Sequence, residues 1–305
     1  MLHASSDESS QNKDKYLHQR WGGALREIYI AQEDVSAYVA FANETALTAA
    51  DCHAIATMLS NRHEPEESLA WVERGIDLGK KTHDSSMAFY SLPRLKRELL
   101  MKLGRGGEAL DAAWAEYLKH PSKDAYYDLM KFVPEAERPV WHVKAIEAAY
   151  DAGGQSLIEL LVSTKEIARL AEFVRQCKDS ALEGMSHYTT EPAAKCLEKT
   201  HSDLAARLWR AQGMRIINAK KSKYYTEALC NFERAMQCYE KSGLTDEWTK
   251  TVAKVRIEHH RKSGFLSGFE ALVAGVGPSR KPSFMERAKA RWSNTEGTDR
   301  KPAPN

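Results

Sequence analysis

Apolar residues recur every three or four positions along two neighbouring stretches of residues 202–241, and this spacing constrains the fold most strongly. The first stretch carries Leu204, Leu208, Ala211 and Ile216. The second stretch carries Tyr225, Ala228, Leu229, Phe232, Ala235, Met236 and Tyr239. Because this period places the side chains on one helical face, it predicts two amphipathic helices joined by a short basic loop. Neither face can be buried alone, so we expect the two helices to stack on each other and on further pairs.

The rest of the chain up to residue 275 repeats this helical spacing, and almost no stretch alternates with a period of two. Helices are expected at residues 15–30, 36–43, 49–61, 65–78, 92–103, 106–120, 122–132, 135–150, 157–162, 165–177, 245–260 and 265–274. We expect Gly104 to end one helix, and Thr164 and Thr245 to cap the starts of two others. The spacing therefore predicts an all-α fold of stacked antiparallel helix pairs.

Two of these helix pairs show a small–large–small rhythm along their second helix. The rhythm runs Ser68, Val72, Gly75 in one pair and Ala228, Phe232, Ala235 in the other. Small residues at these positions let neighbouring helices approach closely. The residues that we expect in the core are Leu99, Leu103, Leu208, Ala228, Phe232, Ala235 and Tyr239.

Composition divides the chain into three parts. Residues 1–13 are rich in Ser, Asp, Gln and Asn, and we expect them to be disordered. Residues 14–275 form the helical domain, with a possible internal boundary near 153–154 or 178–184. Residues 276–305 are basic and polar, and we expect a largely flexible tail.

Two sequence features predict a cytoplasmic protein without integral membrane association. No window approaches the roughly 18 consecutive apolar residues of a membrane span, and the first 14 residues hold no apolar run of the signal-peptide type. The cysteines at 52, 177, 196, 230 and 238 are scattered without paired spacing, so we expect free thiols.

The pattern Ala228-x3-Phe232-x2-Ala235 resembles the second helix of a tetratricopeptide repeat. Residues 95–116 and 208–248 resemble a bacterial helical-repeat family that is sometimes found behind SWIM-type zinc fingers. The repeat length is irregular, because 41 residues separate Ser68 from Ala109, against the 34 of a regular array. The resemblance implies an irregular tetratricopeptide-like α-solenoid that acts as a binding scaffold. The chain lacks the cysteine–histidine pattern of a SWIM finger, so that module's metal and nucleic-acid role is not carried over.

The sequence holds no arrangement that predicts catalysis. The glycines at 104, 106 and 107 lack the preceding strand and the Lys-Ser/Thr of a phosphate-binding loop. His259 and His260 are adjacent, so on a helix they point about 100° apart and do not share a metal easily. We therefore expect a non-enzymatic protein with no cofactor and no metal.

Charge is distributed unevenly along the chain. Residues 1–153 carry 18 Lys and Arg against 24 Asp and Glu, whereas residues 154–305 carry 26 against 18. No acidic residue lies between Asp203 and Glu227. The residues there that could bind nucleic acid are Arg207, Arg210, Arg215, Lys220, Lys221, Lys223 and Tyr224. The cations could neutralise phosphates while the tyrosine stacks on a base, although a lysine-rich loop is commonly only solvated.

Two functions remain open from the sequence. The first is a protein-interaction scaffold that binds a partner protein or peptide in the groove of a helical solenoid. The second is an accessory nucleic-acid-binding protein that uses the basic C-terminal half. The sequence leaves open which partner is bound and what the oligomeric state is.

Overall fold

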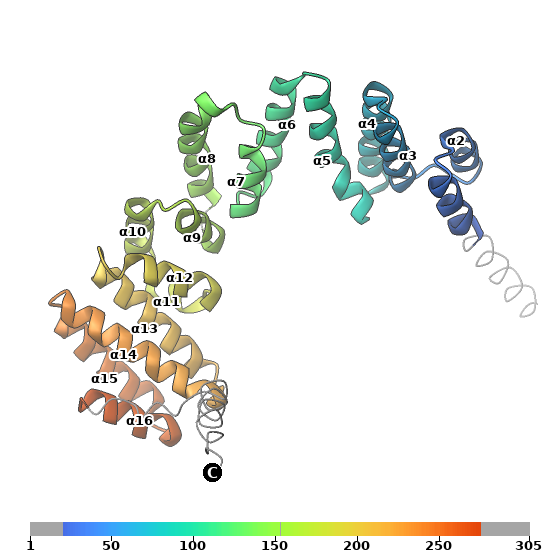
Figure 1. Ribbon diagram of the computed structural model, residues 1–305. Coiled ribbons are helices and arrows are strands. Elements are labelled where there is room, and N and C mark those ends of the chain that lie inside the picture. Colours follow the sequence, from blue (N-terminus) through green and yellow to red (C-terminus); the bar gives the residue numbers. More distant parts are fainter. Residues whose placement is uncertain (1–20, 153, 276–305) are drawn as a thin grey trace, which may run out of the picture. The chain divides into compact units, whose positions relative to one another are not determined.

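The computed structural model describes residues 21–152 and 154–275, which form helices and short connections without any strand (Figure 1). The chain divides into two compact units, residues 1–153 and 154–305. The all-α prediction is confirmed for the described residues. The expectations for residues 1–13, 15–20 and 276–305 lie outside them.

In the N-terminal unit, a helix over residues 21–31 precedes α2. The others are α2 (Val35–Glu44), α3 (Ala49–Asn61), α4 (Pro65–Thr82), α5 (Met87–Lys102), α6 (Gly106–Lys119), α7 (Lys123–Met130), the 3-10 helix η1 (Glu135–Glu137) and α8 (Arg138–Ala152). Local chemistry sets several of these starts. Thr48 and Asp51 form a reciprocal capping box at α3, and Pro65 begins α4. Gly104, in the left-handed region with a φ of 71°, follows α5 as expected.

Two apolar clusters between successive helices form part of the core of the N-terminal unit. One joins α2 to α3, and the other joins α3, α4, α5 and α6. The rhythm at Ser68 and Gly75 lies in this second contact. The Ser68 hydroxyl donates a 2.7 Å hydrogen bond to the Ala56 carbonyl, and a Cβ on Gly75 would lie 2.7 Å from Cys52 Cβ. Small residues therefore allow α3 and α4 to approach closely.

The C-terminal unit is built around the helix pair that the apolar spacing predicts. Its helices are α9 (Gly154–Ser163), α10 (Ile167–Gln176), α11 (Asp179–Gly184), α12 (His187–Leu197), α13 (Ser202–Asn218), the 3-10 helix η2 (Ser222–Tyr224), α14 (Tyr225–Lys241), α15 (Thr245–His259) and α16 (Ser263–Val273). Phe232 of α14 is fully buried and packs edge-on against Phe269, at 5.2 Å between ring centroids. Phe265, also of α16, lies 6.0 Å from Phe232. The contacts between these rings hold α16 against α14, in an apolar cluster that also includes residues of α13.

The expected core residues lie mostly in the interior. Leu99, Leu208, Ala228, Phe232 and Ala235 are fully buried, and Tyr239 is 3% exposed. Leu103 is half-buried, because it lies just past the end of α5 and packs against the edge of its cluster.

Four local expectations differ from the structure. Helix α4 continues through residues 80–82 instead of ending near residue 78. Helix α5 begins at Met87 instead of at residue 92, because the Ser86 hydroxyl accepts the Phe89 N–H at 3.2 Å. Thr164 does not cap α10, since its hydroxyl donates to the Leu160 carbonyl at the end of α9. Thr245 is the first residue of α15 rather than its cap.

Gly213 offers a test of the close approach between α13 and α14. A Cβ at this position would lie 2.8 Å from the Phe232 ring, which its buried neighbours hold in place. We expect Gly213→Ala to destabilise the C-terminal unit by about 1–3 kcal/mol from overpacking, less a gain of about 1 kcal/mol in helix propensity. Gly107, in α6, has no atom within 4 Å of its Cβ position, so Gly107→Ala is the matched control. Urea unfolding of both variants measures the difference, and equal stability would contradict the close approach.

Candidate functional site

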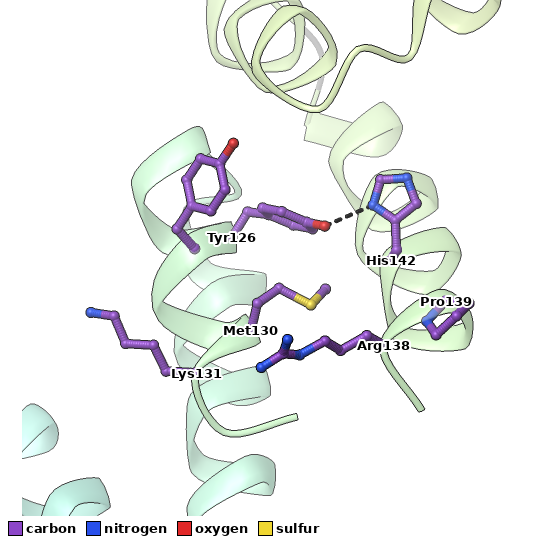
Figure 2. A pocket seen from close by; sticks show the side chains of 7 residues that line it. Tyr126, Met130, Lys131, Arg138, Pro139 and His142 are labelled. Carbon is purple, nitrogen blue, oxygen red and sulfur yellow. Dashed lines mark hydrogen bonds between the residues drawn. The ribbon is translucent and has the colours of Figure 1, made fainter. Parts of the chain in front are cut away.

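An open hollow of about 500 Å³ lies between α7 and α8 of the N-terminal unit (Figure 2). Its lining residues are Tyr126, Tyr127, Met130, Lys131, Arg138, Pro139 and His142. The accessible lining is mostly apolar, and its volume falls within the range of small-ligand and side-chain pockets. We call it the α7–α8 pocket.

Tyr126 and His142 join the two walls of the α7–α8 pocket. The Ser122 hydroxyl accepts the Ala125 N–H at 3.2 Å and so begins α7 one turn before Tyr126. The Tyr126 hydroxyl lies 2.8 Å from His142 Nδ1 (Figure 2). The Tyr127 ring stands edge-on to Tyr126, at 5.3 Å between centroids, and Tyr127 is 46% exposed. The pocket therefore has a hydrogen bond between its two walls and an exposed aromatic ring in its lining.

Two cations flank the pocket, and they differ in their partners. Lys131 lies 3.2 Å from Asp128, whose other oxygen binds the buried Arg97 of α5 at 2.6 Å. Arg138 is exposed, and no carboxylate in the described part of the chain pairs with it. In Figure 2 the Arg138 side chain reaches from α8 towards α7, alongside Met130. An acidic group entering the pocket would therefore meet an unpaired guanidinium beside apolar surface.

A second hollow, of about 330 Å³, lies among α11, α13, α14 and α15 of the C-terminal unit. Charged side chains dominate its lining, but most of them form ion pairs within the unit. Lys250 lies 2.7 Å from Glu247, and Lys254 lies 3.6 Å from Glu183. The charges therefore serve contacts within the unit, which makes this hollow the weaker candidate.

Arg207 and Arg210, both expected to bind nucleic acid, face this second hollow and are used internally. Asp179 of α11 lies 2.9 Å from Arg207 and 2.5 Å from Arg210. Arg207 also donates to the Cys177 carbonyl at 2.6 Å. Burial alone would raise the pKa of Asp179, but the hydrogen bond from Arg207 and the charge of Arg210 outweigh it and lower that pKa. These two arginines hold α11 against α13. Their contact with nucleic acid stays a prediction.

The other five residues of that basic stretch are exposed: Arg215, Lys220, Lys221, Lys223 and Tyr224. Within the described residues, none of the four cations forms an ion pair with a carboxylate. Lys223 Nζ lies 4.8 Å from the centre of the Tyr224 ring. The end of α13 and the segment between α13 and α14 present uncompensated positive charge to solvent.

Within residues 21–152 and 154–275, no group of three or more His, Cys, Asp or Glu is placed to hold a metal ion. None of the five cysteines forms a disulfide within these described residues. No helix of the described residues has the length and apolar content needed to cross a membrane.

The sequence did not indicate the α7–α8 pocket. Tyr126 and His142 are 16 residues apart on two helices, and only the packing of α7 on α8 brings them together. The available signal was the pair of adjacent tyrosines, Tyr126 and Tyr127, on a helix of eight residues. Because adjacent residues on a helix point about 100° apart, the two rings do not both face the core of so short a helix.

The comparisons with known proteins give one family. A family of unknown function (DUF6880) matches residues 2–267 of the chain. No curated protein and no solved structure matches it. The family description names no ligand, so the pocket's ligand must follow from its geometry.

Proposed function

The chain belongs to the DUF6880 family, and we propose that it acts as a non-enzymatic protein-interaction scaffold that binds a partner segment in the α7–α8 pocket. One observation carries the proposal, namely an open apolar hollow with an unpaired arginine at its side. An apolar side chain of the partner would enter beside Met130, and an acidic side chain next to it would pair with Arg138. The ligand is thus an apolar anchor followed by a carboxylate.

The surroundings of the pocket support a protein partner rather than a small metabolite. Tyr127, which lines the pocket, is 46% exposed, and most of the accessible lining is apolar. Apolar and aromatic side chains that remain in solvent around a hollow are typical of partner-binding surfaces. A peptide would cover these side chains, whereas a small molecule would leave them exposed.

We extend the proposal to the architecture within each unit, which we interpret as an irregular tetratricopeptide-like α-solenoid. Successive helices packed through small residues, as at Gly75 and Gly213, support it. Stacked helix pairs present extended surfaces for peptides. A cytoplasmic setting is part of the proposal, in keeping with cysteines that form no disulfide in the described residues.

Selection from a displayed library of random peptides tests the proposal on the full chain. We expect enriched peptides to share an apolar or aromatic residue close to Asp or Glu. Tyr127→Ala is expected to weaken these peptides about tenfold or more, and Arg138→Glu to weaken mainly those that carry the acidic residue. Isothermal titration calorimetry of individual peptides measures both effects.

The control for this selection is Tyr90→Ala, because Tyr90 of α5 is also exposed and also lies beside an aromatic ring. This variant is expected to bind like the wild type. Peptides that bind Tyr127→Ala and Arg138→Glu as well as they bind the wild type would place the binding surface elsewhere. A selection without enrichment would remove the support for a peptide scaffold.

The second candidate function is binding of nucleic acid by the loop between α13 and α14. The exposed cations at 215, 220, 221 and 223 favour it, because no carboxylate in the described residues neutralises them. Phosphate contacts of this kind produce affinity that falls steeply with salt. The loss of Arg207 and Arg210 to internal ion pairs leaves fewer cations for this function, so we rank it second.

A further inference from the structure

Two tryptophans on neighbouring helices hold a lysine of the same chain between them. Trp114 of α6 and Trp141 of α8 meet edge-on, with ring centroids 5.5 Å apart and planes at 74°. Lys144 Nζ lies 4.4 Å from the centre of the Trp114 ring and 4.1 Å from that of Trp141. One ammonium group therefore contacts two indole faces, which is the arrangement that recognises cations by their attraction to aromatic rings.

Contacts other than Lys144 hold both rings in place. The Trp141 indole N–H donates to Glu137 at 3.2 Å, one turn earlier on the chain. Trp114 stacks on Tyr117 at 5.6 Å, and the buried Tyr117 hydroxyl donates to the Ala145 carbonyl of α8 at 2.7 Å. These contacts tie α6 to α8. We call the space over the two indole faces, where the ammonium group lies, the Trp114–Trp141 recess, and we expect it to persist without the lysine.

Lys144 itself is weakly held. Its side chain is exposed, and no carboxylate of the described residues forms an ion pair with it. An exposed contact between a cation and an aromatic ring favours an equilibrium by only about twofold to fivefold. A second ammonium that brings additional contacts can therefore displace it.

We propose that the Trp114–Trp141 recess binds a lysine side chain of a partner protein, and that Lys144 is the resident cation which that side chain displaces. The recess selects an ammonium group because its walls are two indole faces and the Glu137 carboxylate lies beside Trp141. The ligand is positively charged, whereas the α7–α8 pocket is suited to an acidic one. The inference rests on the two rings and their occupant, and it stands whether or not the pocket binds a peptide.

Nuclear magnetic resonance of the indole N–H groups of the full chain tests this inference. The signals of Trp114 and Trp141 are assigned with the variants Trp114→Phe and Trp141→Phe. The probes are Nα-acetyl-lysine amide, its trimethylammonium analogue and, as an uncharged control, Nα-acetyl-norleucine amide. In Lys144→Ala we expect both cations to shift these two signals with saturation, and norleucine amide to leave them unmoved.

The wild type is expected to bind the two cations about twofold to fivefold more weakly than Lys144→Ala, because its own lysine competes. Lys80→Ala removes an exposed lysine of α4 and is expected to match the wild type. Lys144→Gln provides a second uncharged variant in case the alanine alters α8, which circular dichroism would reveal. Absence of saturable shifts in both Lys144 variants, or equal shifts with norleucine amide, would overturn the site. Equal affinity of wild type and variants would overturn the role of Lys144.

Discussion

Phe232→Ala is expected to lower the free energy of unfolding of the C-terminal unit by roughly 3–5 kcal/mol. The ring is fully buried, contacts Phe265 and Phe269, and lies against Gly213, which leaves no side chain to fill the gap. A cavity at this point would remove contacts between α13, α14 and α16 at once. Urea unfolding followed by circular dichroism measures the loss.

Two control variants separate the size of the cavity from a general effect of losing an aromatic ring. Phe232→Leu keeps most of the buried volume and is expected to cost about 1 kcal/mol. Tyr188→Ala removes a ring that is 77% exposed in the same unit, and it is expected to change stability by about 0.5 kcal/mol or less. A near-neutral Phe232→Ala would contradict the packing of these helices.

Asp51→Asn is expected to destabilise the N-terminal unit by roughly 3 kcal/mol, because it breaks a buried charged network. The Asp51 side chain is 2% exposed and accepts hydrogen bonds from Arg26 at 2.6 Å, the Tyr38 hydroxyl at 3.0 Å and the Thr48 N–H at 2.9 Å. An asparagine amide would turn two N–H donors towards these donors. Urea unfolding detects the loss, and amide hydrogen exchange in α3 assigns it to this unit.

The same network makes part of this stability depend on pH. Burial alone would raise the pKa of Asp51, but the hydrogen bonds from Arg26, Thr48 and Tyr38 outweigh it and lower that pKa. A lowered folded-state pKa means that the contribution is complete above the unfolded value of about 3.9 and disappears as pH falls through the folded value. The stability difference between wild type and Asp51→Asn is therefore expected to shrink on acidification below about pH 4.

Tyr38→Phe provides the control for Asp51→Asn. It removes one hydrogen bond to Asp51 and leaves the charge pair intact, so a loss of about 1 kcal/mol is expected. A loss that persists unchanged at acidic pH in Asp51→Asn would show that the charge does not contribute. A loss as small as that of Tyr38→Phe would contradict the network.

The sequence predicted those helices whose apolar spacing is regular over three or more turns. The pair α13–α14 has this property, and Phe232 lies in its core as expected. Helix starts were predicted where the capping residue stands directly before the helix, as with Ser122. Thr48 and Asp51 have the spacing of a capping box, so this pattern also indicates the start of α3 in the sequence.

Helices α11 and α12 were not predicted, and their sequences explain why. Residues 179–184 form a helix of six residues, too short to show a period. The next helix contains Pro192, which ordinarily marks a helix end. Because α11 was missed, Asp179 was not recognised as the partner of Arg207 and Arg210.

The candidate site was beyond prediction for a related reason. The α7–α8 pocket and the tryptophan recess each combine residues from two helices, and no local period encodes which faces of α6, α7 and α8 meet. A charged residue in sequence also does not reveal its partner. Arg138 and Arg210 look alike along the chain, yet only Arg138 is without a carboxylate partner among the described residues.

Calorimetric titration distinguishes peptide binding in the α7–α8 pocket from nucleic-acid binding. The full chain is titrated with a library-derived peptide and, in parallel, with a single-stranded DNA oligonucleotide. Both titrations are run at two salt concentrations. We predict that the peptide binds with an affinity that changes little with salt and drops in Tyr127→Ala, while the oligonucleotide gives no saturable signal. The contradicting result is an oligonucleotide affinity that falls steeply with salt and disappears when Lys220, Lys221 and Lys223 are changed to Glu, together with no peptide binding.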